Sequence, residues 1–382
     1  MTTAAYDPEA RHDTPLALKL KARIRRDGPI PVHEYVRSCL QDPEHGYYRS
    51  RPAIGAAGDF ITAPEISQAF GELIGLWSAV VWQQMGSPQR LHLVEAGPGR
   101  GTLMADALRA TARVAGFHAA ADVVFVESNA TLRAAQAVAM RSSGVAARWC
   151  EAFPTLAHPA IVIANEFLDA EPVVQRIKTA EGWRLRSVGL DDLGRLQFAS
   201  MAAGGEETVI EARRPAAPVG SIDEESRSQL LAWLQVQLQD RGRGAPLIAA
   251  LCIDYGTSEP RLGDTLQAVL GHAFEHPLAN PGLADLSTAV DFHGAVRQMH
   301  DAGFAVGGPV TQAEFLGRLG MLERASRLMA ANPDKAATIE AGVARLLSPS
   351  GMGTRFKVLG VRSTVLPPLP GLTEVDTRPR TP

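Results

Sequence analysis

The segment LHLVEAGPGRGTLMADAL, which starts at Leu91, most constrains how this chain can fold. A β-prone run ends at Glu95, a turn follows with glycine at positions 97, 99 and 101, and a helical stretch begins at Thr102. Glycine lets the backbone approach a ligand closely, and the start of the following helix offers free N–H groups. In a parallel sheet such a turn lies beyond the carboxyl ends of the strands, where ligands bind. The segment therefore predicts an α/β fold with a ligand site at this turn.

Strand-like and helix-like segments alternate on both sides of this turn. Helical stretches separate the first three of five β-prone runs, and alternation at this spacing indicates a mainly parallel sheet covered on both faces. The five runs are Leu91–Glu95, Val123–Glu127, Val145–Trp149, Ala160–Ala164 and Leu247–Asp254, and a later strand is expected in TRFKVLGVRS.

The rest of the chain divides into segments of different character. Thr62 and Glu65, like Thr311 and Glu314, have the spacing of a helix capping box. Residues 255–290 show little periodicity and predict a long lid or binding loop. We expect an N-terminal helical region packed on the cofactor domain (1–90), an α/β core (91–171 and 246–364), an insertion of antiparallel strands with a helix over Glu224–Asp240 (172–245) and a flexible tail (365–382).

The glycine spacing and two acidic residues indicate which ligand the turn binds. A phosphate-binding loop would end in Lys followed by Ser or Thr, and a dinucleotide motif would read G-x-G-x-x-G; this turn reads G-x-G-x-G after Glu95. A carboxylate at the strand end would repel a pyrophosphate but tolerate a cationic methionine group. The next strand also ends in an acid, Glu127, placed to bind ribose hydroxyls. The form acid-x-Gly-x-Gly-x-Gly resembles the first motif of class I S-adenosylmethionine-dependent methyltransferases.

A second group of acidic residues follows the fourth strand, in ANEFLDAEPV. Asn165 and Glu166 come just past this strand and Asp169 one turn later, so these carboxylates would hold a cationic acceptor or merely cap the start of a helix. Asp254 ends the fifth strand at the same edge of the sheet and is expected to face the substrate.

Composition excludes several classes of protein. With 38 basic and 41 acidic residues the formal charge is −3, which argues against a broad nucleic-acid surface. The three cysteines lie far apart in the sequence, so we expect no disulfide scaffold and expect the protein to occupy a reducing compartment. His272 and His276 have no third partner at a convincing spacing, so no metal site is expected. No apolar run is long enough to cross a bilayer, and no secretory signal or transit peptide is recognisable, which predicts a cytoplasmic protein without membrane insertion.

Taken together, five motifs closely resemble the MidA-like (DUF185) methyltransferase family. They are GDFITAPEISQAFGELIGLW, LVEAGPGRGTLMADALR, ANEFLDAEPV, IDYG followed by GDTLQAV, and GPVTQAEFLGRLG, in order over about residues 30–362. The resemblance implies a class I S-adenosyl-L-methionine-dependent methyltransferase fold with helical and inserted elements around it. It assigns cofactor binding to Glu95, Gly97, Pro98, Gly99, Gly101, Thr102, Glu127, Ser128 and Asn165, with Asp59, Thr62 and Pro64 closing the pocket.

The resemblance also implies an acceptor. The family includes a mitochondrial protein arginine methyltransferase that assembles respiratory complex I, so a protein arginine, in a complex I subunit, is the expected substrate; a eukaryotic relative would lie in the mitochondrial matrix. A guanidinium stays protonated, so fixed carboxylates must orient it, and Glu166, Asp169 and Asp254 are the expected catalytic residues. A catalytically weak binding module or assembly factor and a small-molecule methyltransferase remain alternatives, and a homodimer remains open.

Overall fold

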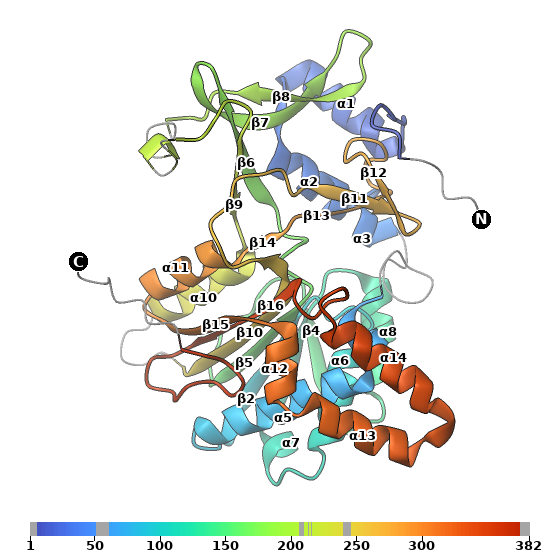
Figure 1. Ribbon diagram of the computed structural model, residues 1–382, viewed down its shortest axis with the longest axis vertical. Helices are drawn as coiled ribbons and strands as arrows, with labels where there is room; N and C mark the ends of the chain where they lie inside the picture. The colour runs from blue at the N-terminus through green and yellow to red at the C-terminus, as the bar shows by residue number, and fades with distance from the viewer. Residues whose placement is uncertain are drawn as a thin grey trace.

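The structure is a computed structural model that describes residues 6–50, 61–205, 210–212, 214, 216–239 and 246–374. Its helices and strands form two units, one above the other in Figure 1. The large unit contains the ligand-binding turn and an eight-stranded sheet, whereas the small unit combines the N-terminal helices with two smaller sheets. Asp59, which the sequence assigns to the pocket, lies outside the described residues.

The sheet of the large unit has the strand order β15-β16-β10-β5-β2-β3-β4, with β14 paired to the end of β10. Strands β4, β3, β2, β5 and β10 run parallel, and β16 and β15 complete the sheet antiparallel. This confirms the mainly parallel α/β sheet that the sequence predicts. The strands are β2 (Leu91–Ala96), β3 (Ala121–Val126), β4 (Ala147–Cys150), β5 (Ala160–Asn165), β10 (Ile248–Thr257), β14 (Val290–Asp291), β15 (Ala305–Thr311) and β16 (Phe356–Arg362).

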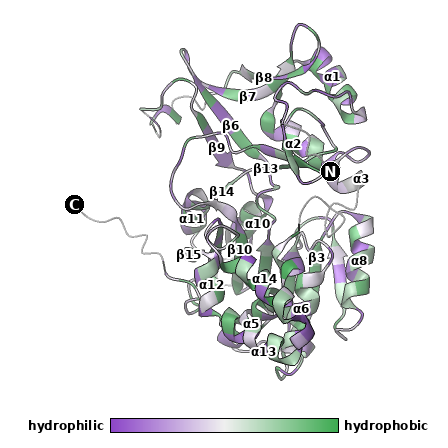
Figure 2. Ribbon diagram, turned by 45° about the vertical axis from the view of Figure 1, so that its right-hand side comes forward, coloured by the Kyte–Doolittle hydropathy of each residue, from purple (hydrophilic) through white to green (hydrophobic). Residues whose placement is uncertain are grey.

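Helices cover both faces of this sheet because its strands are apolar on both sides. Leu93 of β2 packs into a hydrophobic cluster with α5 and α6, whereas the next residue, Val94, packs into a second cluster with α10 and α11. In Figure 2 these helices carry both hydrophobic and hydrophilic residues, as expected of helices with one buried face. The helices are α4 (Ala63–Ile66), α5 (Gln68–Gln84), α6 (Thr102–Thr111), α7 (Phe117–Ala120), α8 (Ala130–Met140), α10 (Gln229–Gln239), α11 (Phe292–Asp301), α12 (Gln312–Arg318), α13 (Met321–Ala331) and α14 (Ala336–Leu347), with a 3₁₀ turn at Pro333–Lys335.

Only one of the two predicted capping boxes forms. Thr311 caps α12 together with Glu314, as predicted. The prediction at Thr62 is wrong, because the Thr62 side chain makes no capping bond and the Glu65 carboxylate accepts a hydrogen bond from the Thr102 hydroxyl instead. The helix expected there is interrupted at Ser67, whose side chain caps α5.

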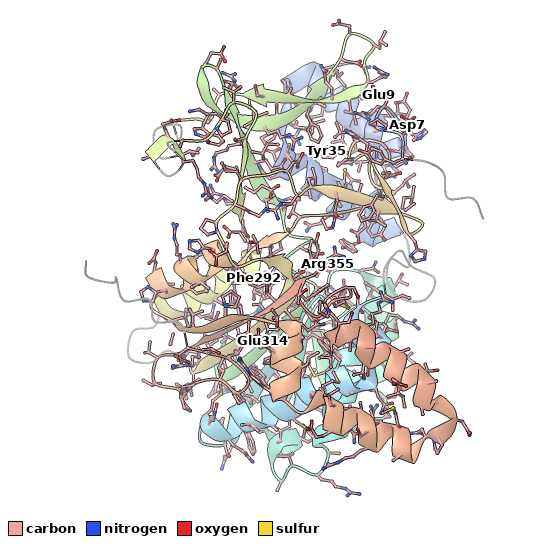
Figure 3. The ribbon with its side chains drawn as sticks, viewed as in Figure 1. Asp7, Glu9, Tyr35, Phe292, Glu314 and Arg355 are labelled. Carbon is pink, nitrogen blue, oxygen red and sulfur yellow. The ribbon has the colours of Figure 1, made fainter. Side chains whose placement is uncertain are left out.

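The small unit is built from segments that lie far apart in the sequence. Strand β1 pairs with β7, and β7 pairs in turn with β6 and β8; all these pairings are antiparallel. Figure 3 labels Tyr35 in this unit, on α2, and Phe292 in the large unit below. The elements of the small unit are α1 (Pro15–Asp27), β1 (Ile30–Pro31), α2 (Val32–Gln41), α3 (Tyr47–Ser50), β6 (Val173–Thr179), β7 (Gly182–Leu190), β8 (Leu196–Met201), β9 (Ile222–Ser226), β11 (Gln267–Leu270), β12 (Ala273–Glu275) and β13 (Asp285–Ser287).

Four expectations about organisation need correction here. Helices α1 and α2 pack on the inserted strands rather than on the cofactor unit, since Leu16 and Val36 share a core with Val188. Residues 255–290 are not a structureless loop, because they contain the antiparallel sheet β12-β11-β13. The inserted helix starts at Gln229, since β9 occupies the preceding residues.

The fourth correction concerns the C-terminal tail. Residues 365–374 are not a frayed end, because Leu366 and Leu369 are buried and the Pro370 carbonyl accepts a hydrogen bond from the Trp77 indole, at 3.1 Å. The Glu374 carboxylate pairs with Arg362 at 2.9 Å, so the tail is held on the large unit up to this residue.

Candidate functional site

The site lies where the strand order of the large sheet reverses, between β2 and β5. From β2 the chain adds β3 and β4 on one side and β5 and β10 on the other. Ala96 at the end of β2 lies opposite Ala164 of β5, so the residues after both strands meet at one edge. Ligands of doubly wound sheets bind in the crevice at this switch point.

The glycine turn has the conformation that its sequence predicts. Gly97, Gly99 and Gly101 have φ values of 60°, 55° and 83°, in the left-handed region that favours glycine. A Cβ on Gly97 would lie 2.8 Å from the Phe167 ring, so no larger residue fits without movement. Helix α6 starts directly after Gly101, which provides no side-chain cap, and its first N–H groups face the turn.

A cavity of about 340 Å³ extends from this turn to the ends of β3 and β4. Glu127 and Ser128 line it. The Glu127 carboxylate is held by the backbone N–H of Asn129, at 2.7 Å, and by the Gln136 amide, at 3.3 Å, while burial raises its pKa. Two fixed carboxylate oxygens at this position are suited to accept hydrogen bonds from ribose hydroxyls.

The same cavity contains residues that the sequence analysis missed. Glu151 and Phe153 follow β4 and line the cavity, and Phe153 stacks on Trp233 with ring centroids 5.0 Å apart. Their position after the third predicted strand was the available signal, because all parallel strands end at this edge. Leu40, Gln41, Tyr48 and Gln229 also line the cavity, and no local pattern marks them.

A smaller cavity of about 40 Å³ adjoins the first, and both are lined by Gly97, Gly99 and Glu166. Thr62, Pro64 and Glu65 line it on one side, and Glu95 and Asn165 on the other, together with Pro98 and Thr102. Glu95 is 3% exposed, and burial raises its pKa to about 8. Its Oε2 atom and the Oδ1 atom of Asn165 are buried without a hydrogen-bond partner among the described residues. A bound ligand would satisfy buried polar atoms of this kind.

Glu166 lies at the junction of the two cavities. Its φ of 52° is in the left-handed region, and its N–H donates to the Ile253 carbonyl at 2.8 Å. The carboxylate accepts hydrogen bonds from the Ala63 N–H, at 2.8 Å, and the Asn165 amide, at 3.2 Å. Burial raises its pKa to about 7. An unusual backbone conformation that neighbouring contacts fix is common at functional sites.

Asp169 and Asp254 lie close enough to Glu166 for their charges to interact, but neither lines the two cavities. Asp254 is fully buried, and its carboxylate accepts hydrogen bonds from the backbone N–H groups of Leu168, Asp169 and Tyr255, at 2.9, 3.1 and 2.8 Å. It therefore holds the turn that carries Asp169 and lines neither cavity. Burial, with the charges of Asp254, Asp285 and Glu166, raises the pKa of Asp169 well above its usual range.

This arrangement fits a nucleoside with a cationic tail. The larger cavity offers apolar rings and the Glu127 carboxylate, and the smaller offers the unpartnered Glu95 carboxyl beside the glycine turn. A positive group there would favour the ionised form of Glu95. The described residues contain no group of three His, Cys, Asp or Glu side chains placed to hold a metal ion. Among their helices, none has both the length and the apolar character of a membrane span.

Comparison with known proteins gives consistent findings. Residues 73–310 match a family model described as "Putative S-adenosyl-L-methionine-dependent methyltransferase". The mitochondrial protein arginine methyltransferase NDUFAF7 homolog of Drosophila melanogaster is 34% identical, over 95% of this chain and 88% of its own. The human mitochondrial protein arginine methyltransferase NDUFAF7 is 32% identical, over 93% of this chain and 85% of its own. A crystal structure from Burkholderia thailandensis, bound to S-adenosyl-homocysteine, superposes with a TM-score of 0.81 at 29% identity and covers 93% of both chains.

Proposed function

The chain belongs to the S-adenosyl-L-methionine-dependent methyltransferase family that its residues 73–310 match, and on this premise we propose that it methylates an arginine side chain of a protein substrate. The family, the α/β fold and the cofactor, S-adenosyl-L-methionine, are those that the sequence motifs predict, and all three are confirmed. The relatives named above are protein arginine methyltransferases, and they cover most of this chain, which supports the same acceptor here.

We assign the cofactor to the two adjoining cavities. Glu127 and Ser128 would bind the ribose, the glycine turn would lie against the methionine backbone, and Glu95 would pair with the methionine ammonium group. Thr62, Pro64 and Asn165 would close the smaller cavity around it. The bound cofactor supplies an activated methyl group on a sulfonium, so the protein has mainly to position and desolvate the acceptor.

The acceptor would be held by Glu166 and Asp169. A guanidinium keeps its proton at any working pH, and carboxylates beside it localise its charge on the nitrogens that they contact, leaving the other nitrogen to face the methyl group. Asp254 would act through the turn that it holds, as a positioning residue rather than a contact to the substrate. The observation that carries the proposal is that Glu166 lines both cavities assigned to the cofactor, so its carboxylate would adjoin the methyl donor that the acceptor has to reach.

Three finer parts of the proposal have different grounds. A subunit of respiratory complex I as the protein substrate rests on the family resemblance, a cytoplasmic location rests on the sequence features described above, and a homodimeric assembly stays open. The relatives named above are mitochondrial proteins.

Transfer of label from S-adenosyl-L-methionine to proteins of a cell extract, followed by mass spectrometry, tests the proposal. Methylated arginine is expected with the native protein, and Glu166→Gln should abolish transfer while the cofactor dissociation constant changes less than about threefold. The exposed substitution Glu323→Gln serves as the control. Label on lysine or on small molecules, with none on arginine, would contradict the acceptor. Retained cofactor binding with no transfer at all would favour the binding-module alternative.

A further inference from the structure

Gln136 of α8 is fully buried and lines neither cavity, yet its side chain contacts two residues that do. Its amide nitrogen donates hydrogen bonds to the Gly99 carbonyl, at 2.7 Å, and to Glu127 Oε2, at 3.3 Å. Its amide oxygen accepts a hydrogen bond from the Trp149 indole of β4, at 2.8 Å. One side chain thus joins the glycine turn, the acid that follows β3 and strand β4.

The chemistry of these three partners fixes the orientation of the Gln136 amide. An indole N–H only donates, so it has to meet the amide oxygen. A backbone carbonyl and a carboxylate oxygen accept, so they have to meet the NH₂ group. Exchanging the oxygen and the nitrogen of the amide would break all three hydrogen bonds. The buried amide therefore has a single orientation.

The two groups that the NH₂ of Gln136 contacts are both acceptors. The Gly99 carbonyl and the Glu127 carboxylate lie within hydrogen-bond distance of the same nitrogen atom, and acceptors that are close together and shielded from water repel each other. One N–H directed at each acceptor offsets this repulsion. Without it, Glu127 Oε2 would lose a donor, while the Asn129 N–H, at 2.7 Å, would still hold Oε1.

Helix α8 is packed closely enough on the glycine turn for this short side chain to reach it. A Cβ on Gly101 would lie 3.2 Å from the Gln136 Cα, so a larger residue would push the helix and the turn apart. Arg133, on the same face of α8, donates to the Glu127 carbonyl at 2.8 Å. Helix α8 therefore holds both the backbone and the carboxylate of Glu127.

We propose that Gln136 is a positioning residue for cofactor binding, which keeps the Glu127 carboxylate in the orientation that accepts hydrogen bonds from the ribose hydroxyls and ties it to the glycine turn. Gln136 acts through Glu127 and Gly99 and does not contact the cofactor. The proposal rests on the assignment of the ribose to Glu127 under the proposed function. A glutamine that only stabilised the fold would leave the preference for a hydroxylated ribose unchanged, whereas a positioning residue sets that preference.

The test compares adenosine with 2′,3′-dideoxyadenosine, which lacks both ribose hydroxyls, by measuring their dissociation constants for the full chain with ligand-observed NMR. The native protein should bind adenosine at least about tenfold more tightly, since hydrogen bonds to a carboxylate are strong. Gln136→Met fills a similar volume without the NH₂ group and should reduce this ratio to about threefold or less, because the Asn129 N–H still holds one oxygen of Glu127.

Gln312→Met is the matched control. Gln312 is also fully buried in the large unit, on α12, and its amide donates to the Leu346 carbonyl at 2.9 Å, but it lines neither cavity and contacts neither Glu127 nor Gly99. This variant should lose stability and keep the native ratio. If Gln136→Met does not fold, Trp149→Phe decides, because it removes only the donor that orients the amide and should lower the ratio severalfold.

Each outcome decides the proposal. A lower ratio in Gln136→Met with a native ratio in Gln312→Met supports it. A native ratio in Gln136→Met, or an equal loss of affinity for both nucleosides, overturns it and leaves the assignment of the ribose to Glu127 standing. Equal binding of the two nucleosides by the native protein refutes that assignment and the proposal together.

Discussion

Replacing Glu95 by Gln should stabilise the cofactor-free protein while weakening its affinity for the cofactor. Glu95 is 3% exposed at the end of β2, and burial raises its pKa from 4.5 to about 8. At pH 7 the folded protein therefore holds this carboxyl protonated, whereas the unfolded chain ionises it. The pKa of this carboxyl in the unfolded chain, 4.5, lies about 2.5 units below pH 7, and each unit corresponds to about 1.4 kcal/mol. Keeping the carboxyl protonated in the folded protein at pH 7 therefore costs about 3 kcal/mol of folding free energy. Glutamine has nearly the same shape and no such cost.

The sign of the effect depends on pH. A raised pKa in the folded state means that the native protein loses stability as the pH rises from about 4.5 to about 8, and that Glu95 costs nothing below the lower value. Urea unfolding without cofactor should thus give equal free energies for both proteins near pH 4.5. At pH 7 the variant should be more stable by up to about 3 kcal/mol. Equal stability of the two proteins at both pH values would refute the reasoning.

The cofactor should reverse this order. If Glu95 pairs with the methionine ammonium group, binding ionises the carboxyl and releases close to one proton at pH 7. Calorimetry in buffers of different ionisation enthalpy should detect that proton for the native protein and none for Glu95→Gln, whose affinity should fall at least about tenfold. Proton release that persists in the variant would show that another group titrates.

Two further substitutions have defined expectations. Gly97→Ala should abolish cofactor binding, because its φ of 60° disfavours alanine and the new Cβ would lie 2.8 Å from the Phe167 ring. Calorimetry should show no binding heat, and near-native affinity would contradict the assignment of the cofactor to the glycine turn. Glu72→Gln should destabilise the protein by about 2–3 kcal/mol in urea unfolding, since this buried carboxylate pairs with Arg109 at 3.0 Å and Arg324 at 2.6 Å. A loss under about 0.5 kcal/mol would mean that water replaces these pairs at little cost.

The sequence alone was sufficient for six of the eight strands of the large sheet and for the centre of its site, whereas β14 and β15 were not predicted. This information is local in the sequence. The apolar runs alternate with helices, Glu95 and Glu127 lie at the ends of two strands, and glycines occupy the three positions of the turn, 97, 99 and 101, where φ is positive. Because parallel strands all end at one edge, a correct strand assignment already brings Glu95, Glu127 and Glu166 to the same crevice.

The roles of other acidic residues depend on neighbours that local sequence does not reveal. Asp254 was expected, like Glu95, to end a strand, but it lies within β10 and its carboxylate accepts hydrogen bonds from three backbone N–H groups. Glu65 has capping-box spacing, yet it bonds to the Thr102 hydroxyl, 37 residues away. Glu151 is a different case, because it follows β4 as Glu127 follows β3, and the strand pattern could have identified it although no prediction named it.

Only the tertiary structure decided how the small unit is assembled. Ile30 pairs with Val188, and Tyr48 bonds to Asp285, across separations of more than 150 residues. Such contacts cannot be read from either segment, because the local sequence around a residue does not specify which distant residue it will meet. Local sequence therefore determined which helices, strands and turns form in the large sheet and which ligand-binding residues lie at the ends of its strands. The folded chain determined which of those groups retain free hydrogen-bonding capacity, since that depends on every neighbour that packing brings to them.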